Sequence, residues 1–370
     1  MITPSPAPSA GSAPESGAGP GSSVGSAPES EALLRLPKVE LHCHVEGTMR
    51  PSTVVDLAGK NGVPLPSADP TELYSYRSLD QFLSVFWLVQ SVLGDRGDWA
   101  RLGYESVVDA SACGRVYAEL FFTPARHLAA GQRLGDIIAG LTEGIAAADA
   151  ETGATTYLIC DIDRAYGGAA GLSLVEELVS LRRSGAPGVE RVLGIGMDST
   201  ELGVDPRSFI PAYQAAAAAG LRRTAHQGED TPASAIGICV DELGAERIDH
   251  GLSLLGDPAL VTRLAGERLP LTVCPTSNVV IANRVPTLAD HPFPAMRAAG
   301  LLATINTDDP ALTGLDLHSE YVDCAAAFGY SFADMVEIAL DAVEASWAAP
   351  EEAAALRARI RAAADVPHPV

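Results

Sequence analysis

The sequence is short of positive charge and of long apolar runs. It has 25 lysines and arginines against 47 aspartates and glutamates, which gives a formal net charge of −22 at pH 7. Because the phosphates of a polynucleotide would be repelled by such a surface, this balance argues against a nucleic-acid partner and suits a small-molecule substrate better. No apolar run reaches membrane-spanning length, so we expect no transmembrane helix and no membrane partner.

The six cysteines form no C-x-x-C pair, and four of them lie inside apolar runs. This pattern is typical of small core residues in a reducing compartment. The first thirty residues are mostly Pro, Ser, Gly and Ala and lack the basic and apolar segments of a secretory signal. We therefore expect residues 1–30 to be a disordered low-complexity tail, and the protein to be cytoplasmic.

Beyond the tail, apolar β-branched runs alternate with helical stretches rich in Ala and Leu. Eight runs are predicted to be strands, at residues 38–47, 116–123, 155–162, 192–198, 221–226, 246–251, 269–275 and 301–306. Eight strands separated by helices predict an α/β fold, the (β/α)8 TIM barrel, over residues 31–370. We expect extra helices after the first strand, over about 52–112, and at the C-terminus. A doubly wound sheet would want a glycine-rich phosphate loop after the first strand, and none is there.

The first predicted strand carries the sequence His42-Cys43-His44. Side chains two positions apart on a strand point to the same side, so His42 and His44 project together. Two imidazoles held side by side on a rigid element make half of a metal site. By itself a His-x-His pair is weak evidence, and the rest of the chain has to supply the other half.

Polar residues gather at the C-terminal ends of six predicted strands, which in a (β/α)8 barrel share one mouth. His226 ends the fifth strand, and Asp308 follows the eighth. Together with His42 and His44 they offer three nitrogen donors and one oxygen donor, a set suited to Zn²⁺. We therefore expect one zinc ion per chain, which can lower the pKa of a bound water toward neutrality.

Further polar side chains at the same mouth predict acid–base chemistry. Glu229 lies three residues beyond His226, where it could move a proton without being a ligand. His250 could hold the attacking water, and the adjacent carboxylates Asp308 and Asp309 would repel each other unless a cation lies close. Taken singly, His226 could be an ordinary strand-end histidine, His250 a surface histidine, and Asp308-Asp309 a helix cap or turn. Four other histidines lack such company and are expected to be surface or structural residues: His127, His291, His318 and His368.

Five segments resemble, in order and register, those of the adenosine/adenine deaminase family, at residues 42–44, 224–229, 247–251, 274–278 and 306–310. The likeness covers roughly residues 36–347. This family of the amidohydrolase superfamily is a zinc-dependent (β/α)8 barrel that hydrolytically replaces the 6-amino group of a purine. The His-x-Glu and Pro-Cys-x-x-Cys pattern of base-flipping nucleic-acid deaminases is missing.

The resemblance implies a role for each polar residue of the mouth. The three histidines and Asp308 would bind zinc, and Glu229 would protonate the ring nitrogen N1. His250, assisted by Asp308, would orient and activate the zinc-bound hydroxide, and Asp309 would hydrogen-bond N7. A barrel that has lost catalysis and only binds a ligand is the alternative from another class, and the presence of Glu229 and His250 argues against it.

Two departures from the adenosine deaminases bear on the substrate. Glu46 stands where many of them carry an aspartate that contacts the ribose 5′-hydroxyl, and residues 197–201 replace their glycine-rich loop. Both features are similar to the adenine deaminase branch. We expect Asp309, Glu46, Ser199 and His44 to contact the substrate. The first expectation is a nucleoside, adenosine or 2′-deoxyadenosine, converted to inosine or deoxyinosine and ammonia. Adenine converted to hypoxanthine, or a modified nucleoside such as aminodeoxyfutalosine, is the alternative. The oligomeric state is left open.

Overall fold

The computed structural model describes residues 27–67, 69–74, 79–282 and 284–366. Its centre is a single sheet in which every strand is parallel to its neighbours and spatial order follows chain order. The strands are β1 (Lys38–Glu40), β2 (Arg115–Phe122), β3 (Thr155–Asp163), β4 (Val192–Asp198), β5 (Arg222–Gln227), β6 (Arg247–His250), β7 (Pro270–Val273) and β8 (Leu302–Ile305). Each lies within two residues of its predicted run, except β1, which ends seven residues before the predicted run does.

The barrel closes just beyond the ends of β1 and β8. Cys43 and Asp308 form an isolated parallel bridge. The His44 N–H donates to the Asp308 carbonyl at 2.8 Å, and the Asp308 N–H donates to the His42 carbonyl at 3.1 Å. The predicted (β/α)8 barrel is thereby confirmed, and its closing contact places the first and last polar clusters of the sequence side by side.

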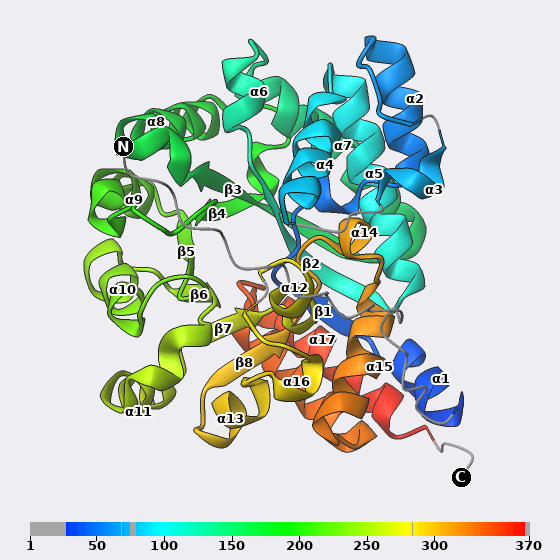
Figure 1. Cartoon of the computed structure of the whole chain (residues 1–370), viewed down its shortest axis with the longest axis vertical. Coiled ribbons are helices and arrows are strands. Elements are labelled where there is room, and N and C mark those ends of the chain that lie inside the picture. Colours follow the sequence, from blue (N-terminus) through cyan, green and yellow to red (C-terminus); the bar gives the residue numbers. More distant parts are fainter. Residues whose placement is uncertain (1–26, 68, 75–78, 283, 367–370) are drawn as a thin grey trace, which may run out of the picture.

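The helices surround this barrel (Figure 1). They are α1 (Ala27–Arg35), α2 (Pro51–Asn61), α3 (Pro70–Leu73), α4 (Leu79–Ser91), α5 (Arg96–Ala112), α6 (Ala125–Ala129), α7 (Leu134–Thr152), α8 (Gly167–Ser184), α9 (Ile210–Ala218), α10 (Ala233–Ile238), α11 (Pro258–Glu267), α12 (Pro275–Val280), α13 (Phe293–Ala298), α14 (Pro310–Thr313), α15 (Leu317–Phe328), α16 (Phe332–Ala345) and α17 (Pro350–Ala364). The extra helices expected after the first strand and at the C-terminus are present as α2–α5 and α15–α17. None of the described helices is long and apolar enough to cross a membrane.

The predicted tail is shorter than expected at its C-terminal end. Helix α1 begins at Ala27, so residues 27–30 are helical, and α1 packs against α15 and α16. The reason is the apolar content that follows, since Leu33 and Leu36 are buried in the core and anchor the helix. Residues 1–26 lie outside the described residues, and for them the tail stays a prediction.

Two buried ion pairs hold the barrel interior together. The Arg247 guanidinium lies 2.7 Å from the Glu119 carboxylate, and the Arg115 guanidinium lies 2.7 Å from that of Glu40. All four side chains are buried. Arg247 also packs over the ring of Trp347, just before the C-terminal helix α17. Removing one partner of such a pair leaves a buried charge uncompensated, so these pairs fix the scaffold on which the mouth is built.

Candidate metal and purine site

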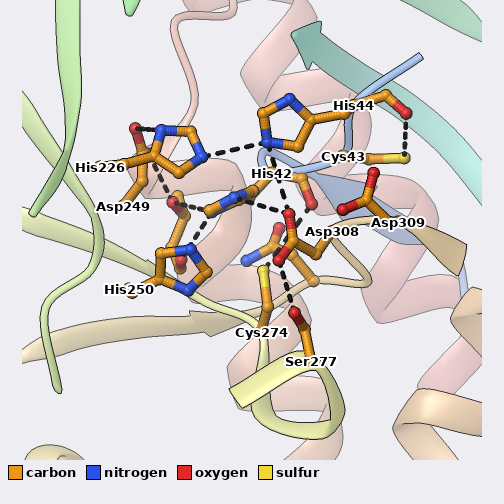
Figure 2. A network of polar contacts seen from close by, with 12 residues as sticks. His42, Cys43, His44, His226, Asp249, His250, Cys274, Ser277, Asp308 and Asp309 are labelled. Carbon is orange, nitrogen blue, oxygen red and sulfur yellow. Dashed lines mark hydrogen bonds and ion pairs between the residues drawn. The ribbon is translucent and has the colours of Figure 1, made fainter. Parts of the chain in front are cut away.

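The predicted metal ligands meet at the C-terminal mouth of the barrel (Figure 2). His42 and His44 lie just past β1, His226 lies within β5, and Asp308 lies three residues past β8. All four are buried, with at most 8% of any of them exposed. Residues separated by up to 266 positions in the sequence thus share one enclosed space.

The ligand atoms of these four side chains converge on one point. His44 Nε2 and His226 Nε2 are 3.1 Å apart, and Asp308 Oδ1 lies 3.3 Å from His42 Nε2 and 3.4 Å from His44 Nε2. One ligand atom from each lies within 4.8 Å of all the others. Within the described part of the chain, the buried His42 Nε2 has no hydrogen-bond partner. A cation at the common centre would satisfy all four atoms.

The other ring nitrogens are held from behind, as metal-ligating histidines require. His42 Nδ1 lies 3.0 Å from the Thr272 carbonyl, which can only accept, so Nδ1 carries the proton and Nε2 keeps its lone pair. His226 Nδ1 faces the Asp249 carboxylate at 3.5 Å. These contacts orient both rings toward the centre before any ion binds.

The electrostatics of the cluster also fit a metal. Burial lowers the pKa of His44 to about 4, and burial together with the neighbouring imidazoles His42 and His44 holds the pKa of His226 well below its usual value. Burial alone would raise the pKa of Asp308, but the adjacent His42 holds it well below its usual range. His44 and His226 therefore present neutral imidazole lone pairs beside an ionised carboxylate, donors that suit a divalent transition metal. Burial would lower the pKa of His42 as well, but the adjacent Asp308 carboxylate raises it, and a cation at the centre would take the place of that proton.

Glu229 and His250 lie beside the metal ligands and are joined by Asn278. The Asn278 side-chain amide donates to Glu229 Oε1 at 2.7 Å and lies 3.1 Å from His250 Nδ1. Its oxygen lies 3.2 Å from His291 Nε2. Asn278 sits in a segment that the sequence singled out, but its linking role was missed. His291 is buried rather than superficial.

The other histidines set aside in the sequence take no part in this cluster. His127 is buried against Trp99, so it is structural rather than a surface residue. His318 is half-buried and lies near Ser30. His368 lies outside the described residues.

Glu201 fixes the loop that carries Glu229. Its carboxylate accepts the backbone N–H groups of Gly228, Glu229 and Thr231 at 3.0, 2.9 and 3.1 Å, and the Gln227 side-chain amide at 2.9 Å. With the Thr231 hydroxyl, five donors on one carboxylate define the backbone path after β5. The sequence placed Glu201 in a polar cluster but gave no reason to assign it this role.

Carboxyl groups line the space next to the ligands. Glu46 Oε1 accepts the Thr123 N–H at 2.9 Å, and Asp198 Oδ2 accepts the Thr123 hydroxyl at 2.5 Å. Burial raises the pKa of Glu46 to about 7 and that of Asp198 to about 8. Burial and the neighbouring Asp308 charge raise the pKa of Asp309 well above its usual value. Protonated carboxyls can both donate and accept, which suits a heterocycle with several ring nitrogens.

The four predicted substrate contacts differ in position. Asp309, Glu46 and His44 are buried at the mouth, whereas Ser199 is exposed just past β4. Their contact with a substrate stays a prediction.

The closed parallel barrel and the cluster of three histidines and one aspartate at its mouth fit a hydrolase of the amidohydrolase superfamily with room for a metal ion. The chain belongs to the adenosine deaminase family, whose sequence model matches residues 37–363. An adenine deaminase of Streptomyces coelicolor is 40% identical over 332 residues, covering 89% of this chain and 95% of that protein.

Solved structures agree in fold over nearly the whole chain. The adenine deaminase of Arthrobacter aurescens superposes with a TM-score of 0.82 at 35% identity, covering 88% of this chain and 98% of that one. An amidohydrolase of Burkholderia ambifaria with bound zinc superposes with a TM-score of 0.83 at 30% identity, covering 92% of this chain and 94% of that one. These likenesses favour the alternative substrate expected from the sequence, adenine, over the nucleoside placed first.

Proposed function

We propose that the protein is an adenine deaminase, which hydrolyses adenine to hypoxanthine and ammonia with the help of one zinc ion. The observation that carries the proposal is the convergence of four buried ligand atoms beside the linked pair Glu229 and His250. The adenine deaminases among its relatives support the same substrate. The zinc bound in a related amidohydrolase supports the choice of metal.

The position of Glu46 supports a free base rather than a nucleoside. Glu46 is only 1% exposed, and its carboxyl is engaged by the Thr123 N–H. A group fixed in this way is not presented to a ribose 5′-hydroxyl. We therefore assign Glu46, which is longer than the aspartate of the adenosine deaminases, to the wall around the base and not to a sugar subsite.

The metal ligands would be His42, His44, His226 and Asp308. Zinc held there would act as a Lewis acid that makes a water molecule nucleophilic near neutral pH. Ser277 supports this arrangement, because its hydroxyl donates to Asp308 Oδ2 at 2.6 Å and leaves Oδ1 for the ion.

The protein groups then move the protons of the reaction. Protonated Glu229, oriented by Asn278, donates to N1 of adenine and makes C6 electrophilic. His250 takes a proton from the attacking water as its oxygen bonds to C6. His250 passes that proton to the amino group, which leaves as ammonia, and the hydroxyl proton at C6 returns to Glu229 as the 6-oxo group forms. One water is thus consumed for each hypoxanthine formed. Asp309, protonated because its pKa is raised, donates to N7 and fixes the ring.

The test is an ammonia-release assay on the purified full-length protein with adenine, adenosine, 2′-deoxyadenosine and analogues with larger groups at N9. We expect kcat/KM for adenine to exceed that for either nucleoside by at least about 100-fold, since the engaged Glu46 carboxyl offers no partner to a ribose hydroxyl. Metal analysis should find about one zinc per chain. A higher kcat/KM for adenosine would overturn the substrate, and active protein without metal would overturn the mechanism.

A further inference from the structure

A polar cavity lies between α4, α6 and the loop that follows α6. Figure 1 shows where the two helices lie. The volume of the cavity is about 210 Å³, and it shares no lining residue with the metal and purine site. Its polar walls come from Gln90 near the end of α4, from Arg126 and His127 in α6, and from Gln132. Nothing in the proposed deamination uses these side chains.

Three buried polar atoms on residues that line this cavity have no hydrogen-bond partner among the described residues: Gln90 Oε1, Arg126 Nε and His127 Nε2. Gln90 and His127 are each 4% exposed. Buried polar groups in folded proteins are nearly always hydrogen-bonded, and an exception calls for a water or an ion. Three exceptions around one space indicate that the space holds a ligand.

The charge of the cavity points to the kind of ligand. Arg126 is always protonated, and the chain has 47 carboxylates, yet in the described part of the chain none lies within ion-pair distance of it. Its guanidinium face is covered by the Trp87 ring, which leaves the N–H edge to point elsewhere. In a protein with so many carboxylates, a partly buried arginine without an acidic partner is free to bind an anionic ligand.

The neighbouring side chains can complete a set of donors. Burial, reinforced by Arg126, lowers the pKa of His127 to about 4, so its ring is neutral and Nε2 can carry the proton. The Gln90 amide presents either its oxygen or its NH₂ group, since the two are exchanged by a half-turn of the side chain. Gln132 is already engaged, because its amide donates to the Leu93 carbonyl and accepts the Trp99 N–H.

We propose that this cavity binds a small oxyanion of the phosphate type, held by the N–H groups of Arg126, His127 and Gln90. The planar guanidinium matches the oxygens of such an anion in geometry and charge. The volume suits a tetrahedral anion and is too small for a whole nucleotide, which could reach it only with its phosphate. An anion there ties α4 to α6 and compensates the charge of Arg126.

The experiment is calorimetric titration of the metal-loaded full-length protein with sodium phosphate, sodium sulfate and 5′-AMP, at ionic strength fixed with sodium chloride. The variant is Arg126→Gln, and the matched control is Arg133→Gln. Arg133 is exposed and has no hydrogen bond or ion pair that the described residues provide, so both substitutions remove one charge from nearby positions. Adenine turnover within about threefold of wild type would certify that each variant is folded.

We expect saturable phosphate binding with Kd below about 1 mM, weakened at least about tenfold in Arg126→Gln and less than about twofold in Arg133→Gln. Gln90→Leu should also weaken phosphate binding, and this second variant keeps the test valid if the arginine variant fails to fold. Arginine-dependent binding of 5′-AMP alone would support the same site and assign the anion to a nucleotide. Absence of saturable binding of all three anions, or equal weakening in both arginine variants, would overturn the proposal.

Discussion

Gly47→Ala is expected to disable the site through a single methyl group. Gly47 follows Glu46 in the short turn after the histidine pair, and a Cβ there would lie 1.9 Å from Asp309 Oδ1 and 2.8 Å from the Asp309 Cα. Ordinary van der Waals contact begins at 3.4 Å, so both the carboxyl and the backbone of Asp309 have to move. Displacement of a substrate-positioning group by about 1 Å costs on the order of 100-fold in rate, equivalent to about 2.7 kcal/mol.

The assay is adenine turnover together with metal content and unfolding in urea. We expect kcat/KM to fall at least about 100-fold and stability to fall by about 1–3 kcal/mol from overpacking. The metal content then shows whether the displacement of Asp309 extends to its neighbour Asp308. The matched control is Gly59→Ala, at an exposed position inside α2 where a Cβ meets nothing within 4 Å. It should keep full activity and gain about 0.5–1 kcal/mol of stability. A Gly47→Ala variant within threefold of wild-type kcat/KM would refute the reasoning.

Three further outcomes are expected. Glu229→Gln should lower kcat at least about 100-fold, because the amide cannot protonate N1, while metal analysis still finds the ion; unimpaired turnover would contradict its role. Removal of the metal by a chelator should lower the melting temperature, because the ion binds only the folded cluster, and added zinc should restore it; an unchanged melting temperature would argue against the site. Glu320→Gln tests a buried carboxyl whose pKa burial raises to about 7. As pH rises from 4.5 to 7, Glu320 loses its proton in the unfolded state but keeps it in the folded state. The stability of the wild type relative to the variant should therefore fall by about 3 kcal/mol over that range. Urea unfolding at pH 4.5 and pH 8 measures the difference in free energy of unfolding between wild type and variant. A difference that does not change with pH would contradict the raised pKa of Glu320.

The barrel could be predicted because strands such as β2, β4 and β8 are largely buried and read as apolar runs. The run 192–198 coincides with β4, and the other predicted strands differ mainly at their ends. The metal cluster could be predicted for a related reason. Parallel strands in a barrel end at one mouth, so His226 and Asp308 needed only to follow their strands to meet His42.

The supporting contacts could not be predicted because they join residues that no local pattern connects. Glu201 meets the backbone of residues 228–231 across a helix and a strand, and Asn278 reaches Glu229 from 49 positions away. The proposed preference for adenine rests on Glu46, whose carboxyl accepts the Thr123 N–H from 77 positions away. The composition predicted a tail that ends too late in the sequence for a similar reason, because α1 is stabilised by packing on the distant helices α15 and α16.

The backbone at the mouth is strained close to the proposed metal and purine site. Among the described residues other than glycine, four have positive φ, and three of these lie at this mouth: Ser199 at 71°, His250 at 66° and Asp308 at 66°. Such a conformation costs on the order of 1 kcal/mol and persists only where the surroundings impose it. At Asp308 the surroundings are the two hydrogen bonds that close the barrel, to the backbone of His42 and His44. The contact that completes the fold thus also turns the carboxylate toward the two imidazoles, so closing the barrel and assembling the metal site are one structural event.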